Sequence, residues 1–213
     1  MAKIGKMFSL LVDIFRYRVS VNQFIKFRNS GRYAFSGSVL PEELPFLKEL
    51  VELSAQYSGP ILEIGTLYGF TTQHIAEYKK PDQELITVDN FSWNPIGLAA
   101  EAHRDLCFRS LYYLRKSANT KIYDGAAASF YSSYDGETPA MVFIDADHTY
   151  ESVREDIDWA VSRGIPIICG HDYSDEIPGV VQAVKEAFPN KFRVTGSLWA
   201  YVAEARETVA PMS

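Results

Sequence analysis

One segment, residues 61–72, constrains the fold more than any other part of this chain. It reads Ile-Leu-Glu-Ile-Gly-Thr-Leu-Tyr-Gly-Phe-Thr-Thr, which predicts a buried strand, a turn at Gly65 and the start of a helix. A second apolar run at 85–88 ends in Asp89. A glycine after a strand lets a ligand approach the backbone, and an acid at the end of the next strand can bind ribose hydroxyls. The segment therefore predicts a nucleoside-binding crevice at the carboxyl ends of parallel strands.

The spacing of the glycines narrows the class of nucleoside. Gly65 and Gly69 form G-x-x-x-G, whereas a dinucleotide site uses G-x-G-x-x-G to seat a pyrophosphate on the helix. Glu63 lies two residues before Gly65, where its carboxylate would repel a phosphate and favour a cationic ligand. S-adenosylmethionine (SAM) is a nucleoside with a sulfonium and no phosphate. The motif favours SAM, and an ordinary strand-turn-helix of another α/β protein is the alternative at this point.

Strand and helix patterns alternate along the rest of the chain. The hydrophobic periodicity predicts helices at 41–57, 70–79, 98–116, 150–162 and 179–188, with a short helical or turn region after 123. Strands are expected at 61–64, 85–88, 121–123, 141–144, 165–169, 191–195 and 198–203. This alternation predicts an α/β fold, a doubly wound and mostly parallel sheet. Only Thr195-Gly196-Ser197 separates the last two strands, so they should pair antiparallel.

We expect a helical arm or lid at residues 1–57 and a ligand-binding domain at 58–213. Residues 1–33 carry seven lysines and arginines against one acid, Asp13. Apolar residues recur there at helical spacing, which favours a lid or dimerising arm that packs on the body, and we therefore expect a homo-oligomer. Two other interpretations of the arm are an amphipathic helix on an anionic membrane and a surface for an acidic partner.

The composition limits the partners and the compartment. The net charge of −6 argues against nucleic acid as a partner. No apolar run reaches the length of a membrane span. The two cysteines, Cys107 and Cys169, do not suggest a disulfide framework, so the expected compartment is the reducing cytoplasm.

Titratable side chains follow two further predicted strands. Asp145 and His148 come after the strand at 141–144, and His171 and Asp172 follow the strand at 165–169. Because the two strands should be neighbours, these side chains are expected to converge in a divalent-metal site. A hydrogen-bonded structural cluster is the alternative. His148 is the best candidate for a general base, because its ordinary pKa lies near physiological pH.

With these residues in place, the chain resembles the class I SAM-dependent methyltransferases. Residues 62–72 are similar to the first motif of the catechol O-methyltransferase-like branch. Residues 143–148 and 170–173, with 178–184 downstream, resemble the bacterial macrocin- and mycinamicin-type O-methyltransferases of natural-product pathways. The resemblance covers roughly residues 58–203, and it is specific because four motifs occur in the same order.

The resemblance implies a Rossmann-like seven-stranded sheet with an antiparallel last strand, and it implies roles for individual residues. SAM would be held by Glu63, Gly65, Thr66 and Tyr68 near the methionine end, by Asp89 on the ribose and by Gly125 and Ala126 near the adenine, with Asp145 beside it. A magnesium or manganese ion would be held by Asp145, His171 and Asp172, with His148 as the base. His171 departs from the family pattern, because magnesium prefers oxygen ligands.

The expected activity is methyl transfer from SAM to a hydroxyl group of a small natural-product or sugar-like acceptor. The N-terminal helices and the loop at 91–97, with Phe91 and Trp93, would cover that acceptor. Two alternatives belong to other classes. One is a metal-dependent oxidoreductase or hydrolase that uses His148, His171 and a carboxylate. The other is a SAM-binding module without catalysis.

Overall fold

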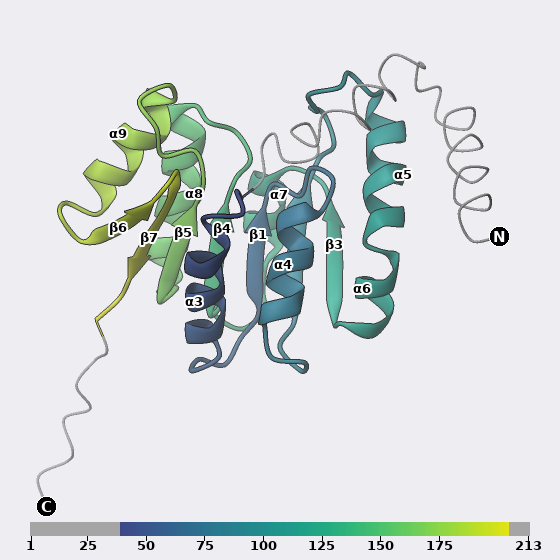
Figure 1. Cartoon of the computed structure of the whole chain (residues 1–213), viewed down its shortest axis with the longest axis horizontal. Helices are drawn as coiled ribbons and strands as arrows, with labels where there is room; N and C mark the ends of the chain where they lie inside the picture. Colours follow the sequence, from purple (N-terminus) through teal and green to yellow (C-terminus); the bar gives the residue numbers. More distant parts are fainter. Residues whose placement is uncertain (1–38, 205–213) are drawn as a thin grey trace, which may run out of the picture.

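The computed structural model describes residues 39–204 and shows one seven-stranded sheet with helices on both faces (Figure 1). The strand order is β3-β2-β1-β4-β5-β7-β6. Strands β1 to β5 pair in parallel, and β7 runs antiparallel to both β5 and β6. The predicted fold class is therefore confirmed. The strands are β1 (Ile61–Ile64), β2 (Leu85–Asp89), β3 (Thr120–Asp124), β4 (Met141–Ile144), β5 (Ile167–Gly170), β6 (Phe192–Thr195) and β7 (Leu198–Val202).

Successive side chains of each strand point to opposite faces of the sheet and contribute to two hydrophobic cores, one on each face. On β1, Leu62 and Ile64 pack with α7, α8 and α9, whereas Ile61 packs on the opposite face with α3 and α4. The parallel strands β1 and β4 are buried along their whole length, as expected for a sheet covered on both sides. The helices are α3 (Leu44–Ser54), α4 (Phe70–Tyr78), α5 (Ala100–Ser110), α6 (Tyr112–Ser117), α7 (Ala127–Ser133), α8 (Tyr150–Ser162) and α9 (Pro178–Ala187).

Helix α3 is part of the body of the domain. Leu47, Leu50 and Val51 are fully buried against the sheet, so the chain is already packed on the core before the predicted boundary at residue 57. The basic arm itself falls in residues 1–38, outside the described residues, so its helical character and the division of the chain at 57 stay predictions.

Most element boundaries differ from the expectation by one to three residues, and one predicted helix is divided in two. The helix predicted over 98–116 is interrupted at Leu111, which separates α5 from α6. The Leu111 side chain is fully buried and lies over Gly69, where a Cβ atom would come within 2.5 Å of it. The strand predicted from 165 begins at Ile167. Among the helices of residues 39–204, none is long and apolar enough to cross a membrane.

Candidate active site

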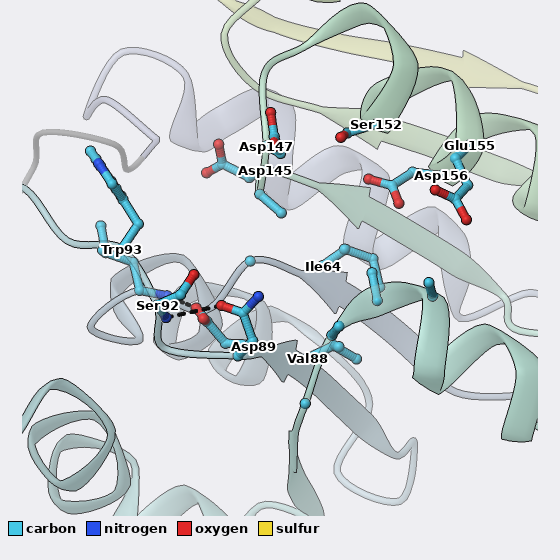
Figure 2. A pocket seen from close by; sticks show the side chains of 18 of the residues that line it. Ile64, Val88, Asp89, Ser92, Trp93, Asp145, Asp147, Ser152, Glu155 and Asp156 are labelled. Atoms are coloured by element: carbon cyan, nitrogen blue, oxygen red, sulfur yellow. Dashed lines mark hydrogen bonds between the residues drawn. The ribbon is translucent and has the colours of Figure 1, made fainter. Parts of the chain in front are cut away.

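A cavity of about 540 Å³ opens at the carboxyl ends of β1, β2 and β4 (Figure 2). Ile64 and Val88 form its apolar floor, and Trp93 lies at one end. The acidic side chains that line it are Asp89, Asp145, Asp147, Glu155 and Asp156. Among the described residues, no lysine or arginine lines the cavity. Five carboxyl side chains against the single imidazole of His148 therefore favour a ligand with positive or neutral groups over a phosphate.

The glycine turn after β1 is packed tightly against the turn after β4. Gly65 has a φ of +98°, and a Cβ atom on it would lie 2.0 Å from the carbonyl oxygen of Asp145. Glycine is required here because a neighbouring backbone, and not only a ligand, approaches closely. Gly65 and Asp145 both line the cavity. Their contact fixes the position of the Asp145 carboxylate relative to the first strand.

Asp89 organises the loops around the cavity. Its Oδ2 atom accepts hydrogen bonds from the backbone N–H groups of Thr66 (2.9 Å) and Leu67 (2.8 Å), and its Oδ1 atom accepts one from Phe91 (2.7 Å). A carboxylate has about four acceptor positions, so these bonds leave room for one more donor. The predicted ribose-binding acid therefore also holds the two loops in place.

His103, on α5, contacts the same two loops. Its Nε2 atom lies 2.8 Å from the carbonyl oxygen of Leu67, and its Nδ1 atom lies 3.3 Å from that of Phe91. Leu67 and Phe91 adopt left-handed backbone angles, with φ of 49° and 56°. Non-glycine residues adopt this conformation at a cost and persist there only when their surroundings hold them. The buried imidazole of His103 supplies that support.

The other predicted SAM-binding residues separate into two groups. Gly125 and Ala126 line the cavity, as do Gly65, Asp89 and Asp145. Thr66 and Tyr68 are buried and do not line it. The Thr66 hydroxyl bonds to that of Thr87, and the Tyr68 ring packs edge-on against His103. These two side chains support the turn. The backbone N–H of Thr66 is linked to the cavity through its hydrogen bond to Asp89.

Glu63 is fully buried beneath the site. Its Oε2 atom accepts a hydrogen bond from the Thr72 hydroxyl at 2.5 Å, and its Oε1 atom has no partner among the described residues. Burial raises the pKa of Glu63 to about 8, and the negative charges of Asp145 and Asp89 add to the shift. The carboxyl is thus poised to become charged when a cation arrives nearby.

Asp145, His148 and Asp172 lie close together at the carboxyl ends of β4 and β5. The Nε2 atom of His148 lies 2.9 Å from Oδ2 of Asp172 and 3.8 Å from Oδ1 of Asp145. The two carboxylates raise the pKa of His148 to about 10, against the effect of burial. Burial raises the pKa of Asp145 to about 6. One ligand atom from each of the three residues lies within 4.8 Å of the others, which is a spacing that a metal ion can bridge.

His171 makes its closest contacts outside this group. Its Nε2 atom lies 2.9 Å from Oε2 of Glu43 and 3.0 Å from the hydroxyl of Ser197, whereas its Nδ1 atom is 3.5 Å from Asp172. Interactions with the carboxylates of Asp172 and Glu43 raise the pKa of His171 to about 10 despite its burial. The geometry thus favours His148 over the predicted His171 as the nitrogen atom beside the two carboxylates.

A protein-family model described as a methyltransferase domain matches residues 62–173. The chain belongs to this family. The match begins on β1 and ends just after Asp172, so it spans every strand end that contributes to the cavity. The sequence matches no curated protein.

Solved structures share the fold of this methyltransferase at low sequence identity. An O-methyltransferase from Bacillus cereus, in complex with S-adenosylhomocysteine (SAH), is 20% identical with a TM-score of 0.60, and the match covers 90% of this chain and 97% of that one. The O-methyltransferase TomG from Streptomyces achromogenes, involved in tomaymycin synthesis and in complex with SAM, is 19% identical with a TM-score of 0.57, and covers 78% and 82%. These likenesses establish the shared fold.

Several residues of the methyltransferase cavity were not predicted as site residues. Ser152 and Asp156 line it from α8, one helical turn apart. Their spacing of four residues indicates that the two side chains share one face of the helix. It does not indicate whether that face borders a cavity or the solvent. In the 91–97 loop, Trp93 is 64% exposed and lines the cavity, whereas Phe91 is buried against α5. Only the tryptophan is therefore placed to meet an acceptor.

Proposed function

We propose that this methyltransferase moves a methyl group from SAM to a hydroxyl oxygen of a small molecule, with His148 as the base and a divalent cation held by Asp145 and Asp172. The observation that carries this proposal is the acidic cavity at the ends of β1, β2 and β4, in which Asp89 and Asp145 flank the Gly65 turn and no lysine or arginine takes part among the described residues.

The charges of the cavity suit SAM better than a dinucleotide. Glu63, Asp89 and Asp145 lie close enough together that the two aspartates raise the pKa of Glu63. The charged aspartates of this group attract the sulfonium and ammonium groups of SAM and repel a pyrophosphate. Asp89 would accept a bond from the ribose with its remaining acceptor position, and the backbone around Gly65 would support the methionine part.

The group formed by Asp145, His148 and Asp172 fits a divalent cation. Carboxylate oxygens are the ligands that Mg²⁺ and Mn²⁺ prefer, and the Nε2 atom of His148 is buried without a well-aligned hydrogen bond in the described structure. When bound, the cation would orient the acceptor oxygen and favour its deprotonation. It would also offset the two negative charges that now keep a proton on His148.

The residues of the chain then account for each change in bonding. The acceptor oxygen attacks the methyl carbon, the carbon–sulfur bond breaks, and its electron pair stays on sulfur to give SAH. His148 takes the hydroxyl proton as the new oxygen–carbon bond forms. Holding the two reactants in line supplies a large share of the acceleration, because it removes the entropic cost of their encounter. The cavity walls provide that alignment.

The test is calorimetric titration with SAM, SAH and NAD, with and without Mn²⁺. We expect micromolar binding of SAM and SAH and none of NAD. Asp89→Asn should weaken SAH binding at least tenfold, on the scale of a lost charge-assisted hydrogen bond. The absence of SAM and SAH binding under both conditions would overturn the proposal.

His148→Ala separates catalysis from binding. In this variant, affinity for SAH and Mn²⁺ should persist while transfer to any acceptor of the wild-type enzyme falls about 10²-fold or more. Binding without transfer by the wild type, over a broad panel of hydroxylated acceptors, would favour the non-catalytic module instead. The oxidoreductase or hydrolase alternative loses support, because the family is that of methyltransferases and Nε2 of His171 faces Glu43. We further propose a natural-product or sugar-like acceptor and a homo-oligomer formed through the N-terminal arm.

A further inference from the structure

The end of the cavity farthest from Trp93 lies between α7 and α8 and has two chemically different walls (Figure 2). On the α7 side, the lining consists of Gly125 and the three alanines at 126–128. On the α8 side, it consists of Ser152, Glu155 and Asp156. Among the described residues, the side-chain hydrogen-bonding groups at this end therefore come from α8. The small residues opposite leave space for a flat ring.

Asp156 is the most buried of these polar residues. The residue is 6% exposed, and its Oδ1 atom accepts a hydrogen bond from the Tyr131 hydroxyl at 2.7 Å. The Tyr131 ring stacks on Trp159 with 4.3 Å between ring centres, which fixes the direction of that hydroxyl. Within the described structure, no hydrogen bond occupies the Oδ2 atom of Asp156. A buried carboxylate that is held by one oxygen thus presents the other to the cavity.

The carboxylate of Asp156 receives one hydrogen bond from the described residues, on Oδ1. Burial raises its pKa to about 7, although the Tyr131 hydrogen bond opposes the shift and the nearby charges of Glu155 and Asp147 add to it. The Oδ2 atom borders the cavity and accepts no hydrogen bond from the described residues, so it is available to a donor on a ligand. A ligand that donates a hydrogen bond at this end would satisfy Oδ2.

The proposed function places such a donor here. With the ribose on Asp89 at the end of β2, the base extends toward Gly125 and the alanines, and its edge farthest from the ribose carries the exocyclic amino group. We infer that Asp156 accepts a hydrogen bond from the 6-amino group of adenine and so selects the adenosyl cofactor. This inference rests on the proposed function. A guanine or hypoxanthine ring would instead turn its carbonyl oxygen toward the carboxylate, which repels it.

The test compares the binding of SAH with that of its purine analogue, which has hydrogen in place of the 6-amino group. Calorimetry on the wild type should give at least about tenfold tighter binding of SAH, the scale of one charge-assisted hydrogen bond. The ratio of the two affinities should decrease in Asp156→Asn and approach one in Asp156→Ala. Glu155→Gln is the matched control, because it also removes one negative charge at this end and should keep the wild-type ratio.

The possible outcomes are distinct. Equal binding of the two ligands by the wild type would overturn the inference without any variant. A wild-type ratio in Asp156→Ala, or an equal loss of both ligands, would also overturn it, since a purely structural role does not change the ratio. Failure of the wild type to bind either ligand would instead overturn the proposed function, and the inference with it.

Discussion

Two glutamates of this methyltransferase have no surface exposed to solvent, and they differ in charge state. Glu43 and Glu63 are both fully shielded from solvent. Burial alone would raise the pKa of each, but hydrogen bonds lower that of Glu43 to about 2, whereas the pKa of Glu63 rises to about 8. At neutral pH the first is therefore a carboxylate and the second is mostly a neutral acid. Burial does not decide the charge of a group, because its partners do.

The partners differ because Glu43 lies in a cluster whose hydrogen bonds are all made within the protein, which we call the closed cluster. Glu63 lies beneath the cavity, which we call the open site. Glu43 receives hydrogen bonds from the N–H groups of Leu40 and Ser197, the Ser197 hydroxyl and the His171 imidazole. Glu63 has the Thr72 hydroxyl on one oxygen, an unpartnered second oxygen, and two aspartates nearby. The closed cluster is complete without a ligand. Glu63 has no cationic partner among the described residues, and SAM would bring a positive charge beside it.

The largest effect should come from removing the charge of Glu43. Glu43→Gln removes the nearer of the two carboxylates beside the buried, protonated His171, so the free energy of unfolding should fall by about 3 kcal/mol or more. Urea denaturation at pH 7 measures it. The matched variant is Glu63→Gln, which replaces a mostly neutral acid by an amide of the same shape and should change stability by less than about 1 kcal/mol. Equal losses in both variants would break the comparison.

The same two residues should limit stability at opposite ends of the pH range. The pKa of Glu63 is higher in the folded state than its ordinary value of 4.5, so its contribution is complete below pH 4.5 and is lost as pH rises to about 8. The pKa of Glu43 is lower, so its contribution is present above pH 4.5 and is lost as pH falls toward 2. Each slope amounts to at most about 1.4 kcal/mol per pH unit.

Denaturation curves collected from pH 3 to 9 would separate these slopes, over about the range where the two groups titrate. Glu63→Gln should flatten the loss above pH 4.5, and Glu43→Gln should flatten the loss below it. An unchanged alkaline slope in Glu63→Gln would mean that other groups dominate it.

The fold could be predicted from the sequence to a large extent, because each strand carries its own signal. The apolar runs at 61–64 and 141–144 coincide with β1 and β4, and the short Thr195-Gly196-Ser197 link correctly indicated the antiparallel hairpin. The interruption at Leu111 could not be predicted. It depends on the packing of that side chain over Gly69, a contact between residues far apart in the sequence.

The site could be predicted only where residues follow a strand end. Asp89, Asp145 and His148 come from such positions and do line the cavity. The roles of His171 and His148 could not be distinguished, because the difference lies in Glu43, which is 128 residues away from its histidine partner. The sequence shows which groups reach the edge of the sheet, and only the three-dimensional structure shows which of them are already satisfied.

Metal binding should distinguish the open site from the closed cluster. Asp145→Asn removes one of two carboxylates and should weaken Mn²⁺ binding at least tenfold, about 1.4 kcal/mol. Asp147→Asn is the control, since its carboxylate accepts the N–H of Thr149 and does not belong to the three-residue group. Calorimetry without SAM measures both. Similar Mn²⁺ affinities in the two variants would place the ion, if it binds, away from Asp145.

The smallest expected effect is the release of protons, at most about one per protein molecule, when SAM binds. At pH 7 the Glu63 carboxyl, with a pKa of about 8, is mostly protonated. A sulfonium and an ammonium group arriving beside it favour its charged form, so the binding of SAM should release up to about one proton. Calorimetry in two buffers of different ionisation enthalpy measures this release. Glu63→Gln should reduce it to near zero, whereas Glu155→Gln, which changes a more distant carboxylate, should preserve it. Equal release by the wild type and Glu63→Gln would show that the unpartnered glutamate does not respond to the ligand charge, and the contrast between the two glutamates would then be one of folding alone.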